Sequence, residues 1–124
     1  MKYEIDYDAF ELAKDIITKL NFDYIDCKRI VFLKSWGSKS RSTLARIHGM
    51  SKVMQIALRT DAVYVIELIT ENFDKLSDDD KTKTIIHELM HIPKCFGGGF
   101  RSHKPYVTKK KVDKAFQNYK RSFN

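Results

Sequence analysis

The stretch IIHELMHIP, residues 85–93, combines two histidines with apolar neighbours and ends in a proline. His87 and His91 are four residues apart, and Glu88 directly follows the first of them. In an α-helix, positions at this spacing differ by about 40° of rotation and one turn of rise. We therefore expect a helix that presents both imidazoles on one face, where a single metal ion can bind both.

The flanking residues predict where this helix begins and ends. Ser77 followed by three aspartates is typical of an N-terminal cap, in which a hydroxyl and carboxylates face the positive end of a helix. The residue before Pro93 is disfavoured in the α conformation, so the helix should end at His91 or Ile92. The apolar residues that fall opposite the histidine pair, and should anchor the helix in the core, are Ile85, Leu89 and Ile92.

The residue types in this segment indicate zinc chemistry. Zn²⁺ prefers imidazole nitrogen, and a catalytic zinc site has three protein ligands and leaves a fourth position for water. The metal lowers the pKa of that water to about 7. Glu88 lies about 100° round the helix from His87, where it can reach the water rather than the metal. We expect His87 and His91 as zinc ligands and Glu88 as the catalytic general base.

The third ligand has to lie elsewhere in the chain. One class of HExxH enzymes has a histidine six residues after the second, but that position is Gly97, and no glutamate follows Glu88 to serve as in another class. Two candidates remain downstream, His103 and Asp113. His103 is favoured, because the glycine-rich turn before it can bring the chain back to the helix. We expect His48 to be a structural or surface histidine.

The rest of the chain predicts a small α+β domain. Apolar residues at three- and four-residue steps indicate an N-terminal helix over 8–20, capped by Asp8 and lying on a sheet. A final helix from Thr108 has one apolar stripe. Three or four strands are expected from the segments 30–33, LARIHG (44–49), KVMQIAL (52–58) and AVYVIELI (62–69), with a loop over 35–43. At 124 residues, the chain is expected to form a single domain over 1–124.

Composition limits the compartment. The chain shows neither a secretory signal nor a run of apolar residues long enough to span a membrane, so we expect a cytoplasmic protein without a membrane partner. Cys27 and Cys95 form no CxxC pair, which favours free thiols that are buried as small apolar residues.

A net charge of +7 favours anionic partners. Basic residues gather in the last helix and around Trp36, and weak contact with single-stranded nucleic acid is possible through phosphates and stacking on the ring. Solvated surface explains these residues equally well. The basic positions concerned are Lys34, Lys39, Arg41, Lys109, Lys110, Lys111 and Lys114.

The segment FDKLSDDDKTKTIIHELMHIPKCFGGGFRSH, residues 73–103, resembles a family of small metallopeptidases from archaea and phages. The family core reads HELxHIP, a glycine-rich turn and a histidine, and ARIHG and YVIELI are also similar. The resemblance covers about the last eighty residues. It implies a minimal zincin-like fold in which His87, His91 and His103 bind zinc and Glu88 is the catalytic acid and base.

The predicted function is hydrolysis of peptide bonds in a peptide or protein substrate by metal-activated water. An exposed edge strand, from AVYVIELI or KVMQIAL, would bind the substrate by backbone pairing. Tyr106 and Arg101 flank His103 and are candidate oxyanion stabilisers. Two alternatives remain. One is a metal hydrolase associated with nucleic acid, such as a ribonuclease or an SprT-like protease. The other is a non-catalytic zinc module with Cys95 as the fourth ligand.

Overall fold

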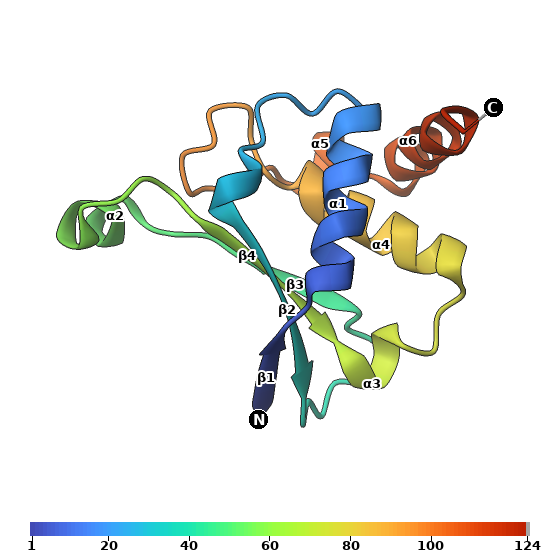
Figure 1. Cartoon of the computed structure of the whole chain (residues 1–124), viewed down its shortest axis with the longest axis horizontal. Helices are drawn as coiled ribbons and strands as arrows, with labels where there is room; N and C mark the ends of the chain where they lie inside the picture. The colour runs from blue at the N-terminus through green and yellow to red at the C-terminus, as the bar shows by residue number, and fades with distance from the viewer. Residues whose placement is uncertain (124) are drawn as a thin grey trace.

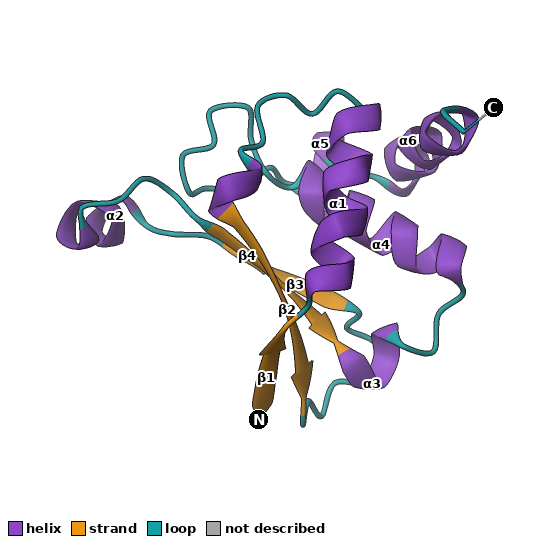
Figure 2. Ribbon diagram, in the orientation of Figure 1, coloured by secondary structure: helices purple, strands orange, loops and turns teal. Residues whose placement is uncertain are grey.

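A computed structural model describes residues 1–123 as an α+β fold in which helices cover one face of a sheet (Figures 1 and 2). The strands are β1 (Lys2–Ile5), β2 (Ile30–Trp36), β3 (Ala45–His48) and β4 (Tyr64–Ile69). The helices are α1 (Tyr7–Lys19), the 3₁₀ turn η1 (Cys27–Arg29), α2 (Lys52–Leu58), α3 (Thr70–Phe73), α4 (Asp78–Met90), α5 (His103–Tyr106) and α6 (Lys109–Arg121).

The strands form a mixed sheet of four in the order β1-β2-β4-β3. β2 and β4 pair in parallel at the centre, whereas β1 and β3 are antiparallel edge strands. The helices α1, α4 and α6 lie on the same side of this sheet (Figure 2). The α+β class predicted from the sequence is confirmed, and the arrangement is that of a small zincin-like domain.

The core lies between the sheet and the helices. Alternate residues of the central strands, among them Phe32 and Ile66, point into it and are almost fully buried. α4 contributes the apolar face predicted from its sequence. The exposed fractions of Ile85, Leu89 and Ile92 are 1%, 0% and 0%. Burial of a side chain of this size contributes about 1.5–3 kcal/mol to folding.

The predicted ends of α4 are confirmed. The Ser77 hydroxyl accepts a hydrogen bond from the Asp80 amide at 3.2 Å, and His91 is the C-terminal cap. The cap of α1 was placed two residues late. Asp6, rather than Asp8, accepts the bond from the Ala9 amide at 3.0 Å, because β1 leads into the helix without a longer connection.

The prediction of a strand at KVMQIAL was wrong, since these residues form α2. Ser51 caps the helix through the Met54 amide at 3.2 Å, and the segment is rich in good helix formers. Gln55 is its one buried residue. No strand borders the segment to supply the pairing that a β conformation requires, because α2 projects away from the body of the molecule (Figure 1).

The predicted sheet lacked one strand, and another of its strands was too short. β1 was missed, because four residues with exposed side chains carry little periodic signal. β2 was expected to end at Leu33 but continues to Trp36, since β1 pairs with its far end, Lys2 opposite Trp36. The segment predicted as a loop from Ser35 therefore begins two residues later.

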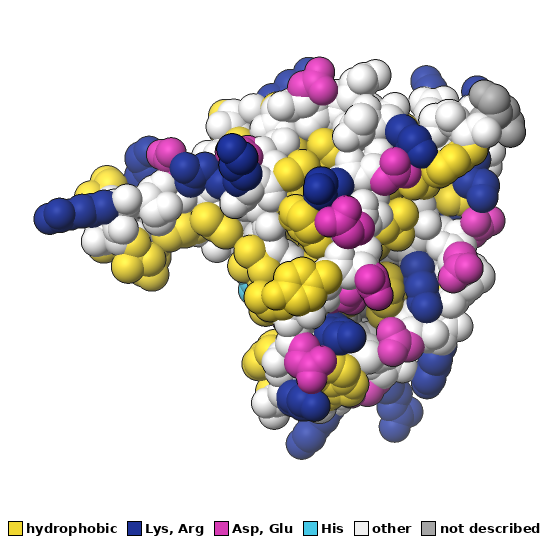
Figure 3. All heavy atoms as spheres, viewed as in Figure 1, with side chains coloured by type: hydrophobic (Ala, Val, Ile, Leu, Met, Phe, Trp, Pro, Cys, Tyr) yellow, Lys and Arg dark blue, Asp and Glu magenta, His cyan; other side chains and the backbone are white. Residues whose placement is uncertain are grey.

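Apolar side chains remain on the surface outside the core. Tyr3 and Ile5 are 53% and 49% exposed on β1. Val53 and Ile56 of α2 are 74% and 69% exposed, and hydrophobic atoms gather along this projecting part of the molecule (Figure 3). Within residues 1–123, no helix combines the length and the apolar character needed to cross a bilayer.

Two isoleucine substitutions test this division between core and surface. Ile86→Ala should lower the free energy of unfolding by about 2–5 kcal/mol, because Ile86 of α4 is fully buried and its truncation leaves a cavity. Ile56→Ala on α2 should change it by less than about 0.5 kcal/mol. Urea unfolding measures both values. Equal losses at the two positions would contradict the exposed placement of α2.

Candidate metal centre

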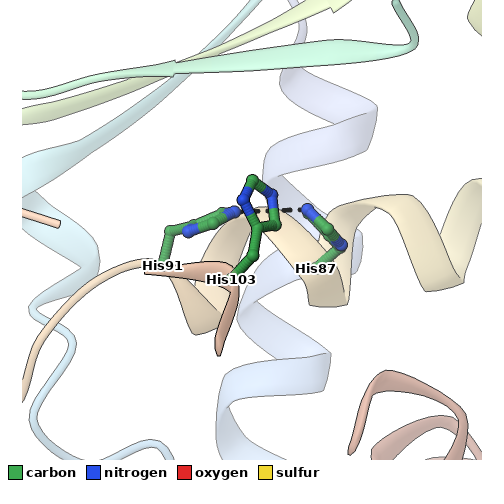
Figure 4. Close-up of side chains that lie close together, drawn as sticks. All are labelled: His87, His91 and His103. Atoms are coloured by element: carbon green, nitrogen blue, oxygen red, sulfur yellow. Dashed lines mark hydrogen bonds between the residues drawn. The ribbon is translucent and has the colours of Figure 1, made fainter. Parts of the chain in front are cut away.

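His87 and His91 project from the same face of α4 (Figure 4). Their Nε2 atoms are 3.2 Å apart, and the ring centroids are separated by 4.9 Å. The face opposite is held in the core, so the helix cannot rotate to separate the rings without exposing its apolar residues. The predicted convergence of this histidine pair is therefore present, with its rigid support.

Backbone hydrogen bonds orient His91. Its Nδ1 lies 2.7 Å from the carbonyl oxygen of Arg101. A carbonyl oxygen can only accept, so Nδ1 carries the proton and Nε2 is left with a free lone pair directed toward His87. This is the support commonly found around ligating histidines, in which a second contact fixes the tautomer and the ring plane.

His103 comes from the segment after the glycine-rich turn, on α5. Arg101, two residues earlier, donates its backbone N–H to the His91 carbonyl oxygen at 2.7 Å, which returns the chain to the end of α4. The His103 ring centroid lies 4.7 Å from that of His91 and 5.4 Å from that of His87. The structure brings together all three predicted histidines, each offering a nitrogen within 4.8 Å of the others.

The spacing of these nitrogens suits a tetrahedral ion. With Zn–N bonds of about 2.0–2.1 Å, two ligand nitrogens should lie about 3.3–3.4 Å apart. The 3.2 Å between His87 and His91 agrees with this value. His103 has an exposed side chain, so a small rotation of its ring can shorten the longer distances. The donor set fits a divalent metal ion that prefers nitrogen.

Local electrostatics favour the neutral form of His87 and His91. Burial, together with the neighbouring His91 and His103, lowers the pKa of His87 to about 4. Burial also lowers the pKa of His91, partly offset by the bond to the Arg101 carbonyl. Neutral imidazole is the form that binds metal, so binding does not have to displace a proton from these rings at neutral pH.

Glu88 is 7% exposed and lies directly after His87 on α4. Burial raises the pKa of its carboxyl to about 7. Its side chain reaches a cleft of about 780 Å³ that also contains His87 and His103. An acidic group in this position can exchange a proton with a molecule bound in the cleft.

The cleft runs from the histidines toward the N-terminal end of α4. One wall consists of residues 42–45, which lead into the edge strand β3, and the other consists of α4 and the start of α6. Polar and charged residues make up most of the lining, with apolar side chains between them, among them Leu44, Leu76 and Val112. The sequence reading missed residues 42–45 as part of the site. The position of these residues just before an edge strand indicates a place in the site only when the order of the strands is known.

The other candidates from the sequence do not join the histidine cluster among the described residues, although Asp113 lines the same cleft. Asp113, the second choice for third ligand, pairs with Lys83 at 3.5 Å and is outside the histidine cluster. His48 contacts the buried Glu67 through Nε2 at 2.9 Å, which agrees with the structural role expected for it. The Arg101 guanidinium lies over the Tyr106 ring, 5.2 Å from its centroid.

Both cysteines are free, as expected, but their predicted burial was wrong. Cys27 is half-buried and Cys95 is exposed. Cys95 also lies outside the group of residues able to share a metal ion with the histidines. Among the basic residues, Lys2 and Lys34 lie over the Trp36 ring at 5.0 and 5.8 Å from its centroid. Contact with nucleic acid through this region stays a prediction.

Comparison with known proteins gives one match. A family model described as "Putative phage metallopeptidase" matches residues 1–121, nearly the whole chain. Neither the curated proteins nor the solved structures give a match. The family description and the histidine cluster both indicate a metal ion.

Replacing the third histidine tests the metal site. His103→Ala should weaken zinc binding by at least about 100-fold, since even the outer partners of metal ligands contribute about 10- to 100-fold. His48→Ala is the matched control and should leave zinc affinity unchanged, because His48 contacts Glu67 instead. Competition with a chelating dye measures both affinities. Unchanged zinc affinity in His103→Ala would reassign the third ligand.

Proposed function

Because the chain belongs to the family described as "Putative phage metallopeptidase", we propose that it is a zinc-dependent peptidase of the HExxH type. The observation that carries the proposal is the convergence of three histidines beside a buried glutamate, in an open cleft. Each of these residue types has a defined role in the hydrolysis of a peptide bond by water.

His87, His91 and His103 hold the zinc ion in this proposal. When bound, the ion supplies Lewis acidity, which polarises a substrate carbonyl and makes water a stronger acid. Glu88 takes a proton from the attacking water and returns it to the leaving amine. Its burial supports this role, because a carboxyl group shielded from bulk solvent exchanges protons with the molecules in the cleft rather than with the surroundings.

The substrate binds along β3. The candidates from the sequence were wrong here, since β4 is a central strand and KVMQIAL is the helix α2. β3 is the edge strand beside α4. The Ile69 amide donates to the Leu44 carbonyl directly opposite it. Because hydrogen-bonded and non-bonded pairs alternate, the backbone groups of Ala45 and Ile47 point to the free edge. An extended peptide can pair with them beside the histidines.

The alternative of a non-catalytic zinc module receives less support. A structural site closes with a fourth protein ligand. Cys95 was the candidate, but among the residues that the structure describes it is not grouped with the histidines. The cleft beside His87 leaves room for water and substrate instead. The proposed substrate is therefore a peptide or protein segment that can adopt an extended conformation.

Glu88→Gln tests the proposed base. The variant should bind zinc as tightly as the unchanged protein but hydrolyse an unstructured protein such as casein about 10²–10⁴-fold more slowly, the usual contribution of a general base. Glu11→Gln, an exposed substitution of the same kind on α1, should retain full activity. Zinc content and initial rates are measured on all three proteins. Full activity in Glu88→Gln would remove the general-base role.

Adjacent proline substitutions test the substrate edge. Ala45→Pro removes an N–H that faces the free edge, so the fold should survive while KM for a peptide substrate rises. Arg46→Pro removes an N–H directed at β4 and should lower the melting temperature instead. Thermal unfolding and steady-state kinetics separate the two effects. An unchanged KM in a folded Ala45→Pro protein argues against pairing at β3.

A further inference from the structure

The segment 95–100, here called the glycine-rich loop, joins the end of α4 to the part of the chain that carries His103. Tyr64, the first residue of β4, is fully buried, and its hydroxyl lies against this loop. It accepts a hydrogen bond from the Gly98 amide at 2.8 Å and donates one to the Gly99 carbonyl oxygen at 2.7 Å. A single side chain thus satisfies two backbone groups in a loop without regular structure.

Gln55 holds the same loop from the other side. It is 7% exposed, although the helix α2 that carries it is otherwise exposed. Its Nε2 donates to the carbonyl oxygens of Met50 and Gly97, both at 2.8 Å. The amide group therefore ties the glycine-rich loop to the segment that leads into α2.

Two glycines permit this close contact. A Cβ atom at Gly98 would lie 2.0 Å from the Met50 carbonyl oxygen, and one at Gly49 would lie 2.3 Å from the Gly98 carbonyl oxygen. Gly98 also has a φ of +103°, which disfavours other residues. The loop and the segment before α2 meet backbone to backbone, so the path of the loop is closely defined.

The far end of the loop reaches the histidines. Arg101 directly follows the loop and forms two hydrogen bonds with His91. The Arg101 N–H donates to the His91 carbonyl oxygen, and the Arg101 carbonyl oxygen accepts from Nδ1 of His91. His103 lies two residues further on. A change in the path of the glycine-rich loop therefore reaches the exposed His103 through only two residues, Arg101 and Ser102.

We propose that Tyr64 and Gln55 are positioning residues for the metal ligand His103 and act through the glycine-rich loop. This inference rests on the proposed zinc site. Neither side chain hydrogen-bonds to the three histidines in the described structure, and the hydrogen bonds of both go to the backbone of the loop or of Met50. The Tyr64 ring also packs edge-on against Phe96 and Phe100 of the loop, with centroids 4.9 and 6.0 Å apart. Their contribution to zinc binding is to hold the loop in the path that brings His103 to the other two ligands.

Tyr64→Phe isolates this contribution, because it removes both hydrogen bonds to the loop and keeps the buried ring. Zinc affinity should fall roughly tenfold, as is usual for outer partners of metal ligands. Cobalt(II), bound in place of zinc, should lose part of the strong visible absorption of a tetrahedral site. Gln55→Leu, which removes the amide donors, should shift both quantities in the same direction.

Tyr119→Phe is the matched control. This substitution also removes a tyrosine hydroxyl. That hydroxyl donates a hydrogen bond to Asp15 at 2.5 Å, which joins α6 to α1 and does not involve the glycine-rich loop. The substitution should lower stability without changing zinc affinity or the cobalt(II) spectrum. Thermal unfolding of the metal-free proteins shows whether the tyrosine variants are folded and comparably destabilised.

A double substitution tests the route through His103. If Tyr64 acts through that ligand, Tyr64→Phe in a His103→Ala background should change zinc affinity by no more than about twofold, because the ligand through which it acts is already gone and the two effects do not add. A further tenfold loss there would overturn the proposal, as would equal zinc affinities in Tyr64→Phe and Tyr119→Phe. Unchanged affinity in His103→Ala alone would instead refute His103 as the third ligand, which is the premise from the proposed zinc site.

Discussion

The structure depends on one constraint on α4, which must bury one face while offering the other to a ligand. Ile85, Leu89 and Ile92 fix the helix against the sheet, and the opposite face carries His87 and His91. The apolar contacts contribute several kcal/mol together, at about 1.5–3 kcal/mol for each buried side chain. The rigidity of the candidate metal centre is therefore a property of the core behind it.

A second requirement is that the chain returns to the helix after it ends. Hydrogen bonds to the backbone of the returning segment hold it in place. Arg101 bonds twice with His91, and the Tyr64 hydroxyl and the Gln55 amide hold the loop in between. Glycines allow this because a side chain at Gly98 would collide with the segment before α2. The third histidine is thus placed by contacts of the loop before it, two of them from side chains outside the histidine cluster.

The sheet gives the cleft its second wall and the substrate its proposed binding edge. Helices cover one face, and β3 is left with free backbone groups next to α4 (Figure 2). The order of the strands decides this, because β4 is the more apolar segment and would be the first choice for a substrate partner on composition alone. Because β4 pairs with β2 on one side and with β3 on the other, its backbone groups are not free to bind a substrate.

The sequence by itself determined the local features that rest on short-range physics. Periodicity and capping defined α4 from Ser77 to His91, the helical spacing paired His87 with His91, and a run of apolar and β-branched residues indicated β4. Only the tertiary structure decided what depends on distant neighbours. KVMQIAL became a helix because no strand borders it, β1 formed because β2 offered an edge, and Asp113 was drawn to Lys83 rather than to the histidines. The approach of His103 lies between the two cases. The glycines made it possible, but the hydrogen bonds of Tyr64, which is remote in sequence, and those between Arg101 and His91 define the path of the chain.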